Sequence, residues 1–148
     1  MNLRAALQKL FARRLFSRPA EPAGCRDIIQ WWEWRRIPYN LAVGAAGIVT
    51  LSVVIGVAAI ASEKFDEPLG LPDPPILAVV AVIAYGLGAN LCFTGGWIVE
   101  ILARWLWPER VGTFAPMAFA LGLALSVLLT LAPAFLFTGV LLLRLAFA

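Results

Sequence analysis

PILAVVAVIAYGLGANLCFTGGWIVEILARWLWP, from Pro75 to Pro108, is apolar enough to cross a bilayer, yet it carries most of the polar residues found in the apolar stretches of this chain. It opens with an aliphatic run and then changes to glycine, asparagine, threonine, glutamate and arginine. A helix of about 20 apolar residues already crosses a hydrocarbon core of about 30 Å. The stretch therefore predicts a transmembrane helix with one face that contacts protein.

Small residues recur every four positions along this stretch, at Gly88, Cys92 and Gly96. Residues at that spacing share one helix face, where small side chains let a neighbouring backbone approach closely. Asn90 and Thr94 lie beside this row. We expect the row to be a packing surface and Asn90 to form a hydrogen bond there.

The charged end of the same stretch contains Glu100 and Arg104, in the i, i+4 order that favours an ion pair. As one helix from Ile76 to Trp107 it would be about 48 Å long, so its end should protrude beyond the hydrocarbon on the cytoplasmic side. We expect Glu100 near that surface, paired with Arg104 or with Arg35 or Arg36. A proton or ion relay through Glu100 is the alternative.

Composition places the whole chain in the same class. The 148 residues are 61% hydrophobic and only 14% charged, with a mean hydropathy of +0.85, whereas soluble domains are about half apolar and a quarter charged. The chain contains no histidine, which excludes imidazole ligands and a histidine base. We expect no metal, no cofactor and no catalysis, because Ser52, Ser126 and Cys92 have no evident activating base.

Two further apolar segments flank the first stretch. The spans are expected at about 39–61, 76–99 with an extension to 107, and 114–143. The last segment is about 30 residues long, and two crossings would need about 40 and a turn, so three spans are preferred over four. The prediction is an all-α membrane protein with three transmembrane helices, a basic interfacial region at 1–38 and a transmembrane domain at 39–148.

The third segment repeats small residues every four positions, at Ala118, Gly122, Ser126 and Thr130. This row predicts a second packing surface, suited to close helix crossing. Pro133 follows within the same segment and should kink the helix, because proline removes one backbone hydrogen bond.

The region before the first span is basic and then rich in tryptophan. Residues 1–24 predict a short helix on an anionic membrane surface, with a loose tail or a mitochondrial targeting segment as alternatives. A helix should begin with Asp27 as its N-cap and end before Pro38. Trp31, Trp32, Trp34 and Tyr39 predict an interfacial anchor, and a docking platform for a partner or a lipid headgroup is the alternative.

Charge asymmetry predicts the orientation. Residues 1–40 contain eight basic and three acidic residues, and residues 62–75 contain one basic and four acidic residues. Basic loops stay in the cytoplasm, so we expect a bacterial inner-membrane protein with a cytoplasmic N-terminus and, after three spans, an external C-terminus. The basic N-terminus should attract anionic lipid, and nucleic acid is not expected as a partner because these charges already lie beside the membrane.

Two short strings, WWEWRRIPYN at 31–40 and ANLCFTGGWIVE at 89–100, resemble a pattern of small bacterial integral membrane proteins that have no assigned activity. The resemblance covers about a third of the chain and implies no function. It favours one polar cluster on the cytoplasmic side, which also takes in the helical neighbours Thr94 and Arg104. Its members would be Glu33, Arg35, Arg36, Tyr39, Asn90, Thr94, Trp97, Glu100 and Arg104.

The abundance of helix-contact faces and the scarcity of reactive groups predict a non-catalytic accessory or scaffold subunit of an inner-membrane complex. The alternative is a homo-oligomeric channel or small transporter. Its polar path would run through Asn90, Thr94, Ser126 and Thr130 to Glu100. Either function predicts a homo-oligomer or a larger membrane complex in the lipid bilayer.

Overall fold

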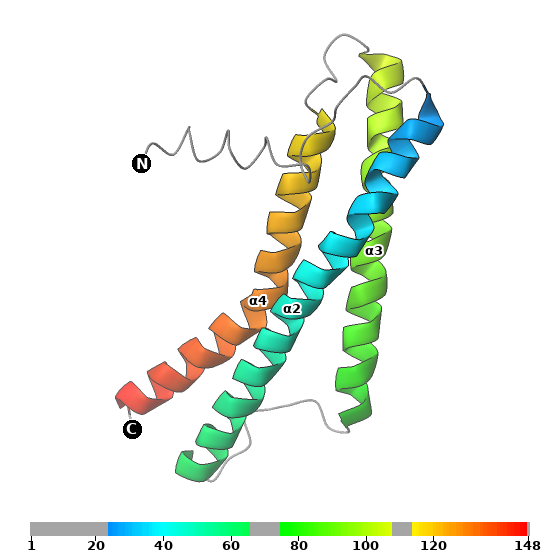
Figure 1. Ribbon diagram of the computed structural model, residues 1–148. Coiled ribbons are helices and arrows are strands. Elements are labelled where there is room, and N and C mark those ends of the chain that lie inside the picture. The colour runs from blue at the N-terminus through cyan, green and yellow to red at the C-terminus, as the bar shows by residue number, and fades with distance from the viewer. Residues whose placement is uncertain (1–23, 66–74, 108–113, 148) are drawn as a thin grey trace. The chain divides into compact units, whose positions relative to one another are not determined.

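The computed structural model describes residues 24–65, 75–107 and 114–147, and the regular structure in these ranges is entirely helical (Figure 1). Helix α2 spans Cys25–Phe65, α3 spans Pro75–Leu106 and α4 spans Phe114–Phe147. All three are long and apolar enough to cross a membrane. The predicted fold class, an all-α chain with three such helices, is confirmed, and each expected span lies within one helix.

Helix α2 begins earlier than predicted and does not end before Pro38. The carbonyl of Gly24 accepts hydrogen bonds from the backbone of Asp27 at 3.2 Å and Ile28 at 3.4 Å, so Asp27 lies in the first turn and is not the N-cap. Its negatively charged carboxylate still interacts favourably with the positive end of the helix dipole. Pro38 is inside α2, and the prediction of a separate helix was wrong. Proline has no backbone N–H to donate at this position, and the residue that follows it, Tyr39, is buried.

Helix α4 also continues through a proline, Pro133. The apolar segment from Phe114 to Phe147 is therefore one helix of 34 residues. At about 1.5 Å per residue it is about 51 Å long, enough for one crossing and too short for two. This continuity rules out the four-span alternative for the described residues.

The described chain forms two compact units, and each helix contributes one segment to unit 1 and another segment to unit 2. Unit 1 takes the start of α2, the end of α3 and the start of α4. Unit 2 takes the remaining segment of each helix. The described segments are 25–40, 89–106 and 114–124 in unit 1, and 41–65, 75–88 and 125–147 in unit 2.

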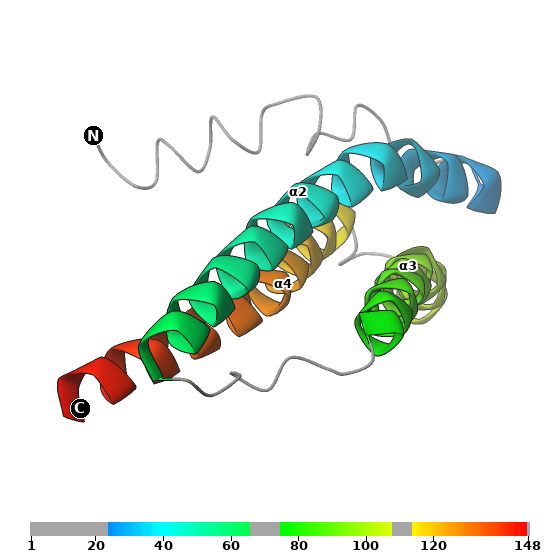
Figure 2. The same ribbon diagram turned by 90° about the horizontal axis from the view of Figure 1, so that it is seen from below.

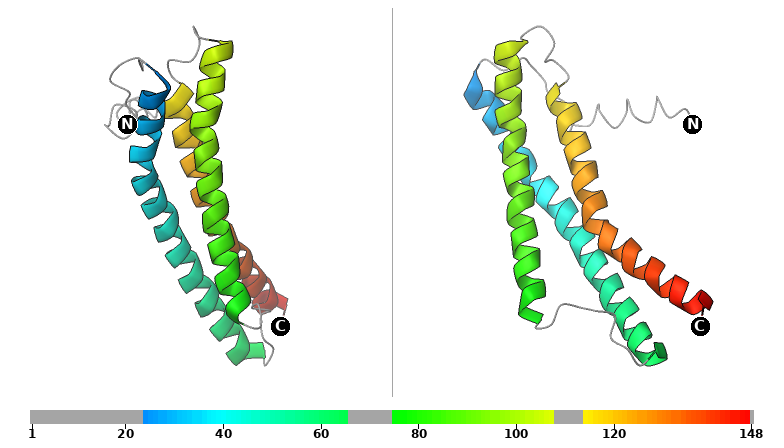
Figure 3. Two further views of the ribbon diagram at one scale, coloured as in Figure 1. Left: turned by 90° about the vertical axis from the view of Figure 1, so that its right-hand side faces the viewer. Right: turned by 180° about the vertical axis from the view of Figure 1, so that it is seen from behind.

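Unit 1 has an aromatic core, with side chains from all three helices. Trp32 of α2 packs edge-on against Phe93 of α3, with ring centroids 5.5 Å apart, and against Phe119 of α4 at 6.2 Å. Phe93 and Phe119 also contact each other edge-on, at 6.3 Å. In Figure 3 these are the blue part of α2, the yellow-green part of α3 and the golden start of α4. The rings therefore join the three helices within unit 1.

Unit 2 has a smaller aliphatic core between α2 and α4. Val57 and Ala61 of α2 are buried against Leu141 of α4. In Figure 2 the green end of α2 lies along the orange and red part of α4, and the start of α3 stands apart from both. Most side chains in residues 76–84 of α3 are exposed. The first turns of α3 thus contribute little to this core.

The predictions for residues 1–23, including the surface helix and the targeting segment, lie outside the described residues. The same holds for most of the acidic connection, at 66–74.

Candidate functional site

The most enclosed polar group described in unit 1 is the carboxylate of Glu100, which is 0% exposed. Its Oε2 accepts a hydrogen bond of 2.8 Å from the indole Nε1 of Trp32. Its Oε1 accepts one of 2.9 Å from Nε of Arg104, one turn along α3. The expected ion pair with Arg104 is present, and both carboxylate oxygens are bonded. The arginine balances a charge that would otherwise be costly to bury.

Gly96 makes room for the Trp32 ring. A Cβ atom at Gly96 would lie 2.7 Å from both Cη2 and Cζ3 of that ring, far inside ordinary contact distance. The ring therefore lies directly on the α3 backbone, one turn before the carboxylate that binds its N–H. We call Phe93, Gly96, Glu100 and Phe119 the Trp32 socket. It requires a residue without a side chain at position 96.

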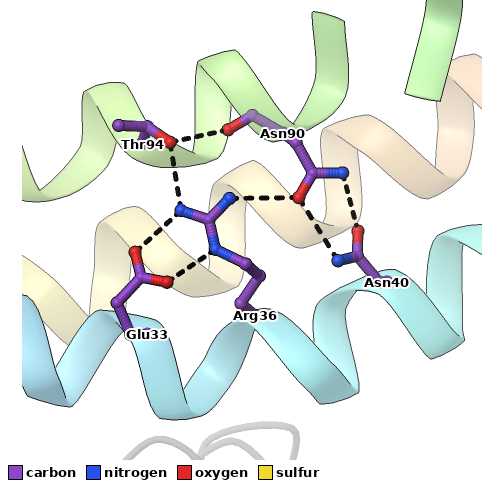
Figure 4. A network of polar contacts seen from close by, with 5 residues as sticks. All are labelled: Glu33, Arg36, Asn40, Asn90 and Thr94. Atoms are coloured by element: carbon purple, nitrogen blue, oxygen red, sulfur yellow. Dashed lines mark hydrogen bonds and ion pairs between the residues drawn. The ribbon is translucent and has the colours of Figure 1, made fainter. Parts of the chain in front are cut away.

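A second polar group joins α2 to α3 around Arg36 (Figure 4). Nε and Nη2 of Arg36 donate to the two carboxylate oxygens of Glu33, at 2.8 and 2.7 Å. Nη1 donates to Oδ1 of Asn90 at 3.2 Å, and Nη2 donates to Oγ1 of Thr94 at 3.1 Å. Four donor contacts thus hold one guanidinium against both helices.

The same group continues through a pair of amides. Nδ2 of Asn90 donates to Oδ1 of Asn40 at 3.0 Å, and Nδ2 of Asn40 donates to Oδ1 of Asn90 at 3.2 Å. We call Glu33, Arg36, Asn40, Asn90 and Thr94 the polar seam. Sequence analysis missed Asn40, although its position one turn after Arg36 places it on the same helix face.

The remaining members of the predicted cluster lie beside these two groups. Arg35 is buried, with its guanidinium carbon 3.6 Å from the centre of the Trp31 ring and Nη1 donating to the Trp31 carbonyl at 2.9 Å. Tyr39 donates its hydroxyl to the carbonyl of Ala89 at 3.3 Å. Nε1 of Trp97 is enclosed and has no acceptor among the described residues. All nine residues of the predicted polar cluster therefore belong to unit 1. They form several separate groups of contacts.

The tryptophans before the first span differ in their burial. Trp31, Trp32 and Tyr39 were predicted to be interfacial anchors, but all three are buried in the core of unit 1, and Trp34 is exposed. The spacing of Ile28, Trp32 and Tyr39, at four and seven residues, matches one face of a helix. This periodicity could have predicted that these side chains are buried together. It applies only if α2 continues past Pro38.

The predicted rows of small residues pack at only some of their positions. In the first row, Gly96 contacts Trp32, but Cys92 is exposed and a Cβ at Gly88 would meet nothing within 4 Å. In the second row, Ala118 is half-buried and Gly122 is exposed, with nothing within 4 Å of its Cβ position. Regular spacing therefore did not identify which small residues touch another described helix.

Ser126 and Thr130, the later members of the second row, belong to a hydroxyl group in unit 2. Oγ1 of Thr130 donates to the Ser126 carbonyl at 2.6 Å, and the hydroxyl of Tyr85 lies 2.7 Å from the same Oγ1. Thr50 donates to the Thr130 carbonyl at 2.6 Å. Sequence analysis missed Thr50 and Tyr85. This hydroxyl group joins α2, α3 and α4 within unit 2.

These arrangements hold helices together. Both carboxylates described in the socket and the seam, Glu100 and Glu33, are bonded to arginines. Among the described residues, no three His, Cys, Asp or Glu side chains lie close enough to hold a metal ion. The hydroxyl of Ser52 donates to its own helix, at the carbonyl of Ile48. Hydrogen bonds therefore cross-link the helices, and the two ion pairs each lie within a single helix.

A scan of protein-family models and searches of curated proteins and of solved structures returned no match to this chain.

Proposed function

We propose that this chain is a non-catalytic accessory or scaffold subunit of a bacterial inner-membrane complex. The observation that carries the proposal is that the Glu100 carboxylate and the Arg36 guanidinium of unit 1 are both bonded to partners within the chain. Glu100 is completely enclosed, and both of its carboxylate oxygens accept hydrogen bonds. Arg36 donates four hydrogen bonds, to Glu33, Asn90 and Thr94. Groups satisfied in this way stabilise a helix arrangement, which is what a structural subunit requires.

The exposed surface supports the same proposal. Large apolar side chains are exposed along all three helices, and within the most apolar window of α3 only 6% of the residues are buried. In a membrane such surface faces lipid or another protein. A chain with little core of its own and stiff internal cross-links is suited to packing against a larger partner.

The proposed placement follows from charge. The eight basic residues in the first 40 favour a cytoplasmic N-terminus, and three crossings then place the C-terminus outside. The basic N-terminal residues would lie against anionic lipid.

Native mass spectrometry of the chain released from membranes in a gentle detergent tests the proposal. We expect a species that contains the 16.0 kDa chain together with at least one other polypeptide. A harsher detergent is the control, because it should release the chain alone. Recovery of the chain only as a monomer, under every gentle condition, would contradict the proposal.

The alternative function is a homo-oligomeric channel or small transporter. The exposed Asn40 amide at one end of the seam favours it, because a polar side chain on a membrane helix can face a water-filled path. A homo-oligomer of fixed size in the same spectra, with liposome flux that is lost in Asn90→Leu, would favour this function over a scaffold.

A further inference from the structure

All six tryptophans of the chain belong to unit 1, and the structure divides them by exposure. Trp31 and Trp32 are in the core, and Trp97 is half-buried. The other three have most of the indole uncovered: Trp34 is 69% exposed, Trp105 is 81% exposed and Trp107 is 59% exposed. Three large exposed aromatic rings therefore belong to this unit, Trp34 in α2, Trp105 in α3 and Trp107 directly after the last residue of α3.

An exposed indole is more favourable in the headgroup layer of a membrane than in water or in the hydrocarbon core. Its ring is apolar, so full exposure to water is unfavourable, and its N–H needs an acceptor that the hydrocarbon core does not provide. The headgroup layer offers both apolar contact and ester or phosphate oxygens, and tryptophan is enriched there in membrane proteins.

Charged residues, like the tryptophans, are more frequent in unit 1 than in unit 2. Unit 2 contains no charged residue from 41 to 62 in α2, a length of about 33 Å, which matches the hydrocarbon core of about 30 Å. Its described charged residues are Glu63, Lys64 and Arg144. Unit 1 contains seven described charged residues in shorter segments: Arg26, Asp27, Glu33, Arg35, Arg36, Glu100 and Arg104.

We infer that the surface carrying the exposed indoles of Trp34, Trp105 and Trp107 contacts the phospholipid headgroups directly. Charge complementarity favours lipid over a protein as the occupant of this surface. Arginines outnumber acids among the described residues of unit 1, and the preceding residues 1–23 carry five basic residues against one acid. Anionic headgroups complement that balance. The inference does not depend on the proposed scaffold function.

Fluorine NMR of the full chain labelled with 5-fluorotryptophan, in nanodiscs that contain anionic lipid, tests this inference. Trp34→Phe, Trp105→Phe and Trp107→Phe each remove an exposed ring and assign its resonance without disturbing the core. The nanodiscs carry a spin label on the lipid headgroup or, in a parallel sample, near the end of the acyl chain. A third sample contains a water-soluble paramagnetic chelate.

The expected result is that the headgroup label broadens the resonances of Trp34, Trp105 and Trp107 more than the acyl-chain label or the chelate does. Trp32 is the matched control, because it belongs to the same unit but its ring is buried, and its resonance should broaden least with every agent. Stronger broadening by the acyl-chain label would place the rings in the hydrocarbon core. Stronger broadening by the chelate would place them in water, and no broadening by any agent would show a protein covering. Each of these three outcomes would overturn the inference.

Discussion

At the scale of single residues, Trp32 and Trp97 show how the same side chain can be satisfied at one position and unsatisfied at another. Nε1 of Trp32 donates to the enclosed carboxylate of Glu100 at 2.8 Å. Nε1 of Trp97 is also enclosed, but it has no acceptor among the described residues. A hydrogen bond to a charged group contributes about 1.5–3 kcal/mol, and a buried donor without a partner costs about 1–3 kcal/mol. The two indoles should therefore respond oppositely to loss of the N–H.

Trp32→Phe should lower the free energy of unfolding by about 2–3 kcal/mol, because it removes a donor from a buried carboxylate. Trp97→Phe should leave that free energy unchanged or raise it slightly, because it removes an unsatisfied donor along with some ring area. Reversible unfolding in mixed detergent micelles, followed by circular dichroism, measures both variants. Equal losses in the two variants would show that ring packing, and not the N–H, determines the effect.

At the scale of helices, the contact between α2 and α3 in unit 1 depends on a missing side chain. The Trp32 ring occupies the space that a Cβ at Gly96 would need, whereas a Cβ at the adjacent Gly95 would meet nothing within 4 Å. The two glycines are neighbours in sequence, but helical geometry turns them about 100° apart. Only one of them faces the other helix.

Gly96→Ala should destabilise the protein by about 1–3 kcal/mol, the usual cost of overpacking, because the Trp32 ring must move. Gly95→Ala is the matched control and should be neutral or slightly stabilising, because alanine favours a helix more than glycine does. Thermal unfolding of the two variants in the same detergent measures the difference. A Gly96→Ala protein as stable as the Gly95→Ala protein would mean that the indole is not seated on the α3 backbone.

Hydropathy predicted the helices well, because the requirement for about 20 apolar residues is local to each segment. The position of α2 around Pro38 was not predictable in the same way. A local rule places a helix end before proline, but the buried residues on both sides, Trp32 and Tyr39, are held by partners on α3 and α4. Those contacts stabilise a continuous helix, and they cannot be read from α2 alone.

At the scale of the whole molecule, the proposed orientation can be tested with a native cysteine. Cys25 is exposed at the start of α2, and Cys92 is the other cysteine in the chain. In a Cys92→Ala background, Cys25 should resist a membrane-impermeant maleimide in intact spheroplasts and react after permeabilisation, because basic flanking residues stay in the cytoplasm.

A Glu63→Cys variant, with both native cysteines replaced, supplies the opposite arm of this measurement. Glu63 is exposed near the far end of α2, so its replacement should react in intact spheroplasts. Labelling of Cys25 from outside, with position 63 protected, would reverse the proposed orientation.

The sequence alone determined the class of this protein, its three long apolar helices and the charge asymmetry along the chain, because hydropathy and charge are properties of each segment by itself. The ion pairs of Glu33 with Arg36 and of Glu100 with Arg104 were also predictable, since helical spacing places each pair within one turn. Only the tertiary structure decided that Trp32 binds Glu100 and that Asn40 pairs with Asn90. The physical reason is that these contacts depend on the rotation and register of one helix against another, which many residues set together.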